Sequence, residues 1–120
     1  MTNIVIDHLK IIKGEQLSSV IFMQDYLQLD FDGNLISCYK WPKVTLNRVG
    51  HSFGDLEYRN AICDLISLEV IDVISTSVEV LIEFKRGTIS FLMEGCDEVI
   101  YFTDSNKEWS YYPFQKKEGE

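Results

Sequence analysis

The segment Gly50-His51-Ser52-Phe53-Gly54 comes closer to a catalytic motif than any other part of the chain. It matches G-x-S-x-G, the nucleophile elbow of α/β-hydrolases, in which a sharp strand-to-helix turn exposes the serine oxygen. In that fold the histidine that takes the serine proton follows the serine in the chain. No histidine follows Ser52, and 120 residues are too few for that fold. We therefore interpret Ser52 as a helix start, because Ser52-x-x-Asp55 resembles a capping box.

Metal-binding side chains are present but badly spaced. His8, His51 and the three cysteines never occur at the short separations that structural zinc sites use. Asp25, Asp30 and Asp32 resemble a calcium loop, but the terminal glutamate of such a loop is missing. The sequence therefore predicts neither a metal site nor a cofactor.

The cysteines Cys38, Cys63 and Cys96 are odd in number and far apart, which favours a reducing compartment over a disulfide framework. A nucleophilic pair of Cys63 or Cys96 with His51 stays open, although nothing in the local sequence supports it. Cys63 falls on an expected helix beside core residues, so packing explains it. Gly14 stands alone, and no phosphate-binding glycine loop is present.

What remains is a surface of aromatic and acidic side chains, which is the composition that anchors protein partners. Its predicted residues are Tyr26, Gln28, Asp30, Tyr39 and Trp41. Glu79 and Glu83, at matching positions of the second half, would extend its acidity. The alternative is that the rings pack under a helix or loop, and Trp109, Tyr111 and Tyr112 share this ambiguity.

The elements that must position these residues follow from apolar periodicity. We expect helices at 4–12 and 55–66 and strands at 17–23, 26–31, 35–41, 70–75, 78–84, 88–93, 99–103 and 109–112, with a short extra strand within 43–49. Asp32-Gly33 predicts a two-residue hairpin turn, since both positions need positive φ. That register puts Tyr26 and Tyr39 on one face, and adding Asn34 to the turn would move the return strand to the other face.

The second half of the chain repeats the apolar pattern of the first. Apolar residues from Leu9 to Phe31 recur 53 positions later, and beyond the turn an offset of 54 pairs Gly33 with Gly87. We predict a duplication of about 4–50 and 55–103 within a single domain of residues 1–115, followed by a disordered tail at 116–120. The expected fold class is α+β: two helix-plus-three-strand repeats that form a mostly antiparallel sheet assembly with two helices.

Charge and hydropathy narrow the function classes. Eleven basic against nineteen acidic residues give a net charge of −8, which disfavours nucleic acid and membrane surfaces and attracts basic partners. No apolar run is long enough to cross a bilayer, and the N-terminal residues lack a signal-peptide pattern. We expect a cytoplasmic protein.

Two segments resemble a family of small bacterial proteins of unassigned function. They are Asp25-Tyr26-Leu27-Gln28-Leu29-Asp30-Phe31 with Tyr39-x-Trp41-Pro42-x-Val44, and Tyr58-Arg59-Asn60-Ala61-Ile62-Cys63. This chain departs from the family pattern at two places: the family has Asp where this chain has Asn60, and Gly-Pro-Glu-Ala where this chain reads Gly95-Cys96-Asp97-Glu98-Val99. The layout is also similar to single-domain immunity proteins of bacterial toxin systems. Because the family has no established chemistry, the resemblance implies no catalytic residue.

The function that these observations predict is non-catalytic protein binding of the immunity type, with a basic protein as the partner. A small-molecule module with a pocket between the two repeats is the alternative, and an enzyme ranks third. A homodimer through an open sheet edge is compatible with all three.

Overall fold

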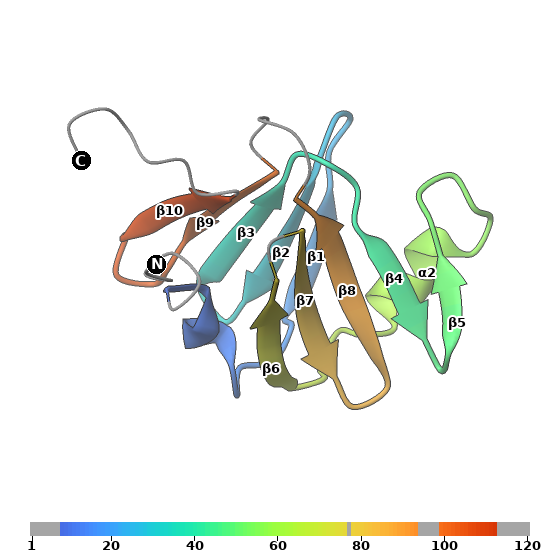
Figure 1. Ribbon diagram of the computed structural model, residues 1–120, viewed down its shortest axis with the longest axis horizontal. Coiled ribbons are helices and arrows are strands. Elements are labelled where there is room, and N and C mark those ends of the chain that lie inside the picture. The colour runs from blue at the N-terminus through green and yellow to red at the C-terminus, as the bar shows by residue number, and fades with distance from the viewer. Residues whose placement is uncertain (1–7, 77, 94–98, 113–120) are drawn as a thin grey trace.

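The computed structural model describes residues 8–76, 78–93 and 99–112. These residues form two antiparallel sheets of five strands each, with the orders β1-β2-β3-β9-β10 and β5-β4-β8-β7-β6 (Figure 1). The strands are β1 (Ser19–Phe22), β2 (Leu27–Phe31), β3 (Asn34–Cys38), β4 (Lys43–Leu46), β5 (Val49–His51), β6 (Val70–Ser75), β7 (Glu79–Phe84), β8 (Gly87–Leu92), β9 (Ile100–Thr103) and β10 (Trp109–Tyr112).

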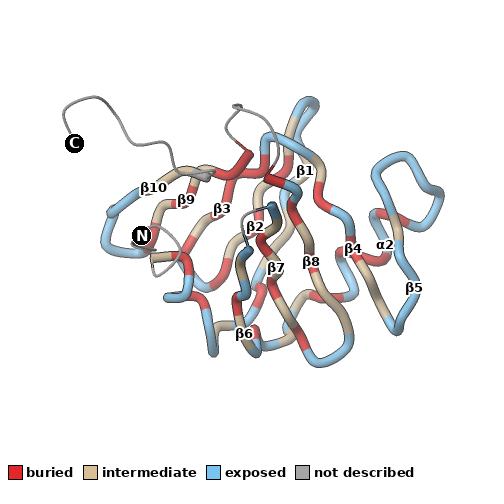
Figure 2. Tube along the Cα trace, in the orientation of Figure 1, coloured by how far each residue is buried: buried red, intermediate tan, exposed pale blue. Residues whose placement is uncertain are grey.

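Alternating side chains create the interior between the two sheets. Strand β2 buries Leu27, Leu29 and Phe31 completely, and β7 alternates in the same way. Figure 2 shows this alternation as red and tan bands along the central strands. The rings of Phe31 and Phe84 stack with their centroids 6.5 Å apart, so the inner faces of the two sheets meet at this pair.

The β2–β3 hairpin has the predicted turn. Phe31 pairs with Asn34, which leaves Asp32 and Gly33 as the two turn residues. Their φ angles are 58° and 98°, as a two-residue hairpin turn with two positive φ values requires. The Asp30 carboxylate accepts a hydrogen bond from the Gly33 N–H at 2.8 Å and holds the turn closed. The predicted register is therefore confirmed.

Helical structure is shorter than predicted. Of the expected helix at 4–12, residues 4–7 lie outside the described residues, and the rest is a helical turn that ends in the 3-10 helix η1 (Lys10–Ile12). The expected helix at 55–66 is reduced to α2 (Tyr58–Cys63). Gly54 has a φ of 101°, and Leu56, expected on the core face, is 94% exposed, so the chain before α2 runs as turns.

The predicted α+β class, with two helices in two helix-plus-three-strand repeats, is wrong. Strands dominate the described residues, and α2 is the one complete α-helix among them. The expected strand within 43–49 is a hairpin of β4 and β5, closed at Asn47 and Arg48 with φ of 51° and 71°. Neither turn residue is a glycine, and for this reason the sequence lacks the usual signal for the turn.

Each half of the chain contributes one hairpin, here called the exchanged hairpin, to the sheet that the other half mainly forms. Strands β1, β2 and β3 form one meander, and β6, β7 and β8 form a second. The β4–β5 hairpin of the first half pairs with β8, whereas the β9–β10 hairpin of the second half pairs with β3. Each half therefore supplies three strands to one sheet and two to the other.

Reciprocal hydrogen bonds join the two halves. Gly14 N–H donates to the Val70 carbonyl at 2.8 Å, and Ser67 N–H donates to the Leu17 carbonyl at 2.7 Å. Gly14 and Ser67 are 53 positions apart, as are Leu17 and Val70, and both donors have positive φ, 89° and 80°. This geometry follows the 53-residue offset, while the duplication itself stays a prediction about the origin of the chain.

The offset of 54 beyond the hairpin turn is wrong. Strand β8 begins at Gly87, which leaves Lys85 and Arg86 as another two-residue turn. The offset therefore remains 53, and it relates Ile36 to Ile89. Both side chains are fully buried. Ile36 pairs with Phe102 of β9, and Ile89 pairs with Val44 of β4.

Candidate functional site

Four of the five predicted surface residues lie along one face, and the fifth does not. Gln28 and Asp30 alternate with the buried residues of β2 and so point outward from the first sheet. Tyr26 and Tyr39, which flank β2 and β3, hold their rings 5.5 Å apart, and Tyr39 is 45% exposed. Trp41 follows the end of β3 and lines a groove that is described below.

Strands β9 and β10 add three aromatic rings to this outer face. Tyr101 lies between the buried residues Ile100 and Phe102, so its ring points outward. Trp109 stacks on Tyr101 at 5.8 Å and on Tyr111 at 6.1 Å between centroids, and Trp109 is 56% exposed. The aromatic face consists of Tyr26, Tyr39, Tyr101, Trp109 and Tyr111.

Sequence reasoning left Trp109 and Tyr111 unplaced and missed Tyr101. The registers Ser37–Tyr101 and Tyr101–Tyr111 bring these residues beside β3. Gln28 lies across Ser37 on the other side and donates to its hydroxyl at 3.2 Å. No local signal shows that β9 pairs with β3, because the two strands are far apart in sequence.

Charged side chains border the aromatic face. Asp25 precedes Tyr26, Asp30 lies at the other end of β2 next to the hairpin turn, and Glu108 precedes Trp109. Lys107 precedes Glu108 and is exposed, whereas Lys40, next to Tyr39 in the chain, lines a cavity with Glu79 of the second sheet. An apolar and aromatic centre with a charged rim is the anatomy of protein–protein interfaces.

Glu79 and Glu83 do not extend this surface. They alternate with buried residues on β7 and therefore point outward from the second sheet, on the opposite side of the sandwich. Glu79 accepts a hydrogen bond from the Ser90 hydroxyl. It also lines a cavity of about 470 Å³ with Lys43. The expectation that both glutamates add acidity to the Tyr26 patch is wrong.

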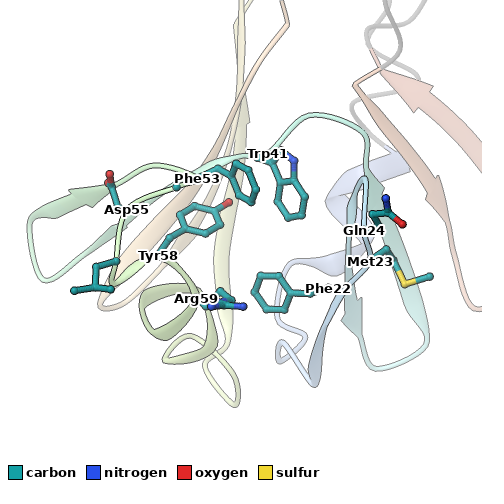
Figure 3. Close-up of a pocket in the computed structure, with 10 residues that line it drawn as sticks. Phe22, Met23, Gln24, Trp41, Phe53, Asp55, Tyr58 and Arg59 are labelled. Carbon is teal, nitrogen blue, oxygen red and sulfur yellow. The ribbon is translucent and has the colours of Figure 1, made fainter.

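Trp41 belongs to a groove of about 440 Å³ between the β1–β2 turn and the segment that leads into α2 (Figure 3). Its lining residues are Phe22, Met23, Gln24, Trp41, Phe53, Gly54, Asp55, Leu56, Tyr58 and Arg59. Trp41 stacks on Phe53 with centroids 4.1 Å apart and planes inclined by 13°. Trp41 is also nearly parallel to Phe22, with centroids 6.5 Å apart and planes inclined by 20°. The groove therefore has an aromatic wall.

Tyr58 anchors this wall to the core. Its side chain is 2% exposed, and its hydroxyl donates to the Pro42 carbonyl at 2.6 Å. Burial, followed by the nearby Cys38 thiol, raises the pKa of the Tyr58 hydroxyl above its usual range. Phe53 meets Tyr58 edge to face at 6.0 Å, so the exposed ring of Phe53 rests on a buried one.

His8, Asp104 and Ser110 form a hydrogen-bonded triad that the sequence did not indicate. His8 Nε2 lies 2.9 Å from Asp104 Oδ2, and His8 Nδ1 lies 2.8 Å from Ser110 Oγ. Asp104 Oδ1 also accepts the backbone N–H groups of Asn106 and Glu108. The hydrogen bond from His8, followed by these backbone bonds, lowers the pKa of the Asp104 carboxyl against the raising effect of burial.

This triad is better explained as structural than as catalytic. In serine hydrolases Nδ1 faces the aspartate and Nε2 faces the serine, whereas here the two nitrogens are reversed. Ser110 lies within β10 opposite Phe102, rather than on an exposed turn. The His8 ring also packs edge-on against Phe102 at 4.8 Å. The triad thus ties the N-terminal helical turn to the β9–β10 hairpin.

The remaining candidates for chemistry do not converge. Cys38 is fully buried, and burial raises the pKa of its thiol; Cys63 is exposed on α2, contrary to the core position expected for it. Cys96 lies outside the described residues. No group of three or more metal-binding side chains occurs in residues 8–76, 78–93 and 99–112. At the rejected elbow, the Ser52 N–H donates to the Asp55 carboxylate at 2.7 Å.

Within the described part of the chain, no helix is long and apolar enough to span a membrane. Comparisons with protein-family models, with curated proteins and with solved structures find no match to this chain. The resemblance to the small bacterial family and to immunity proteins therefore stays a prediction.

Proposed function

We propose that this protein is a non-catalytic binding protein that docks a basic protein partner on the aromatic face. The observation that carries the proposal is the set of five aromatic rings on one side of the first sheet, with Tyr39 and Trp109 about half exposed. Tyrosine and tryptophan dominate binding energy at protein interfaces because they bury large areas at a small entropic cost.

The net negative charge of the chain favours a basic protein as the partner. A net charge of −8 speeds encounter with a basic protein, and Asp25, Asp30 and Glu108 place part of that charge at the rim of the aromatic face. An immunity-type protein, which masks a basic toxin surface, is the form of this function that we favour. Free Cys38 and Cys63 fit a reducing cytoplasm.

Affinity capture with matched variants tests the proposal. Tagged protein would be used to capture partners from its source cells, in parallel with Trp109→Ala, Tyr39→Ala and the control Leu92→Ala. Leu92 is 59% exposed on the second sheet, so its truncation removes a similarly exposed apolar side chain away from the aromatic face. All variants would first be checked for a native unfolding transition.

We expect one stoichiometric basic protein whose affinity falls about 30-fold in Trp109→Ala, the loss of a hot-spot side chain. Its association rate should also fall as salt concentration rises. Retention of the same partner by both face variants at undiminished affinity would refute the aromatic face as the docking site. A partner that carries a net negative charge would refute the electrostatic argument.

A further inference from the structure

The groove beside Trp41 is separate from the aromatic face and forms a second candidate site. The proposed protein binding does not depend on this groove. We propose that the groove of about 440 Å³ beside Trp41 binds a small aromatic carboxylate, with the ring on the Trp41–Phe53 wall and the carboxylate on Arg59. A cavity of this size is within the range of small-molecule sites, which are mostly apolar with a few orienting polar groups.

The apolar half of the site is open and held in position. Phe53 is 58% exposed and Met23 is 41% exposed, yet Phe53 is fixed between Trp41 and the buried Tyr58. Figure 3 shows the rings of Trp41, Phe53 and Tyr58 gathered on one side, with Phe22 across from them. A planar apolar group gains more from such fixed rings than a flexible chain does, because stacking needs no reordering of the wall.

Arg59 supplies the polar recognition. Its guanidinium lines the groove and makes no hydrogen bond or ion pair with any other described residue. The nearby acids are engaged elsewhere: Asp55 accepts from the Ser52 N–H, and Glu57 accepts from the Asn60 amide. Figure 3 also shows Asp55 directed away from Arg59. A guanidinium next to an apolar wall selects a carboxylate, which it can bind through two hydrogen bonds.

The net charge of −8 does not exclude an anionic ligand at this position. Exposed charges more than about 8 Å away are screened at physiological ionic strength, so the distant carboxylates contribute little here. Asp55 also lines the described groove, but its carboxylate is directed away from Arg59 (Figure 3). The charge does exclude ligands with several negative groups, since only one cation lines the described groove. The ligand class is therefore an aromatic monocarboxylate.

Two-dimensional NMR with 1-naphthoate as the probe tests this site. The two tryptophans, Trp41 and Trp109, give separate indole N–H signals, one in the groove and one on the aromatic face. We expect saturable shifts of Trp41 with a Kd of about 0.05–1 mM, as the size of the probe allows, and an unmoved Trp109 signal. The neutral analogue 1-naphthylmethanol should bind about fivefold to tenfold more weakly.

Matched variants separate the two halves of the site. Arg59→Gln should weaken naphthoate about fivefold to tenfold and leave naphthylmethanol unchanged. Arg86→Gln, in the β7–β8 turn outside the groove lining, should change neither. Phe53→Ala should weaken both probes. Absence of a Trp41 shift at 5 mM naphthoate would overturn the proposal. Equal binding of both probes in wild type and Arg59→Gln would overturn the carboxylate assignment. Because Trp109 reports on the aromatic face, failure here leaves the partner proposal standing.

Discussion

Replacing Phe84 by alanine tests the packing of the two sheets against each other. Phe84 is 3% exposed and stacks on Phe31 from the opposite sheet at 6.5 Å. Truncation of a fully buried phenylalanine costs about 3–5 kcal/mol, from lost burial and from the cavity that remains. A domain of this size has a free energy of unfolding of about 5–15 kcal/mol. Phe84→Ala should therefore lose a large share of its stability while still folding at low temperature.

Phe31→Ala gives a second, independent estimate. Phe31 is fully buried and lies at the position equivalent to Phe84 in the other half, so its truncation should cost the same within about 1 kcal/mol. The double variant should lose about 0.5–1.5 kcal/mol less unfolding free energy than the sum of the two single losses. The reason is that the stacking energy between the two rings can be removed only once. Leu92→Ala, at an exposed position of β8, should change stability by less than about 0.5 kcal/mol.

Urea denaturation followed by circular dichroism measures the wild type and all four variants, with the slope m checked for constancy. Phe31→Leu and Phe84→Leu provide milder versions if an alanine variant is too unstable to purify. Strictly additive losses in the double variant would show that the rings do not meet across the sandwich. A loss below about 1 kcal/mol for either phenylalanine alone would contradict its burial.

Three further predictions concern single groups. The pKa of Asp104 is held below its ordinary value of 3.8, chiefly by its hydrogen bond to His8, so its stabilising effect is complete above pH 3.8 and is lost as pH falls through the folded pKa. The denaturation midpoint of wild type should therefore exceed that of Asp104→Asn at pH 6 and approach it near pH 2. In a Cys96→Ser background, a thiol reagent should label exposed Cys63 in the native protein but label buried Cys38 only in urea. Equal labelling rates of Cys38 and Cys63 in the native protein would contradict this. Gly87→Ala should cost more than about 2 kcal/mol in urea titrations, because its methyl group would overlap the backbone of β4, and a neutral result would disprove that close approach.

Strands and their local turns were predictable from the sequence because the signals are local. Alternating apolar residues marked β2 and β7, and the Asp-Gly turn set the register of the first hairpin. The β4–β5 hairpin was missed because Asn47 and Arg48 adopt positive φ without a glycine. The second helix was overestimated because Leu56 and Ile66 continue a helical spacing, whereas the backbone is α-helical only from Tyr58 to Cys63.

The candidate site was only partly predictable for a different reason. The positions of Tyr26 and Tyr39 follow from one hairpin, which the sequence specifies. The rings on β9 and β10 join them only through the pairing of β3 with β9, and no local pattern specifies that pairing. Trp41 follows the end of β3, beyond the reach of strand alternation, so its stacking on Phe53 depends on a tertiary contact.

The exchanged hairpins also determine the order in which this chain can fold. Cys38 pairs with Ile100, so the first sheet cannot close until β9 has been synthesised and has crossed from the second half. Contacts between such distant residues require loop closure before any stabilising contact forms, which slows folding. During synthesis, β1, β2 and β3 emerge before β9, so the edge of β3 should stay unpaired until β9 is made. An unpaired strand edge promotes association with other chains. Fragments 1–54 and 55–120 should accordingly be unfolded alone and should fold together when mixed.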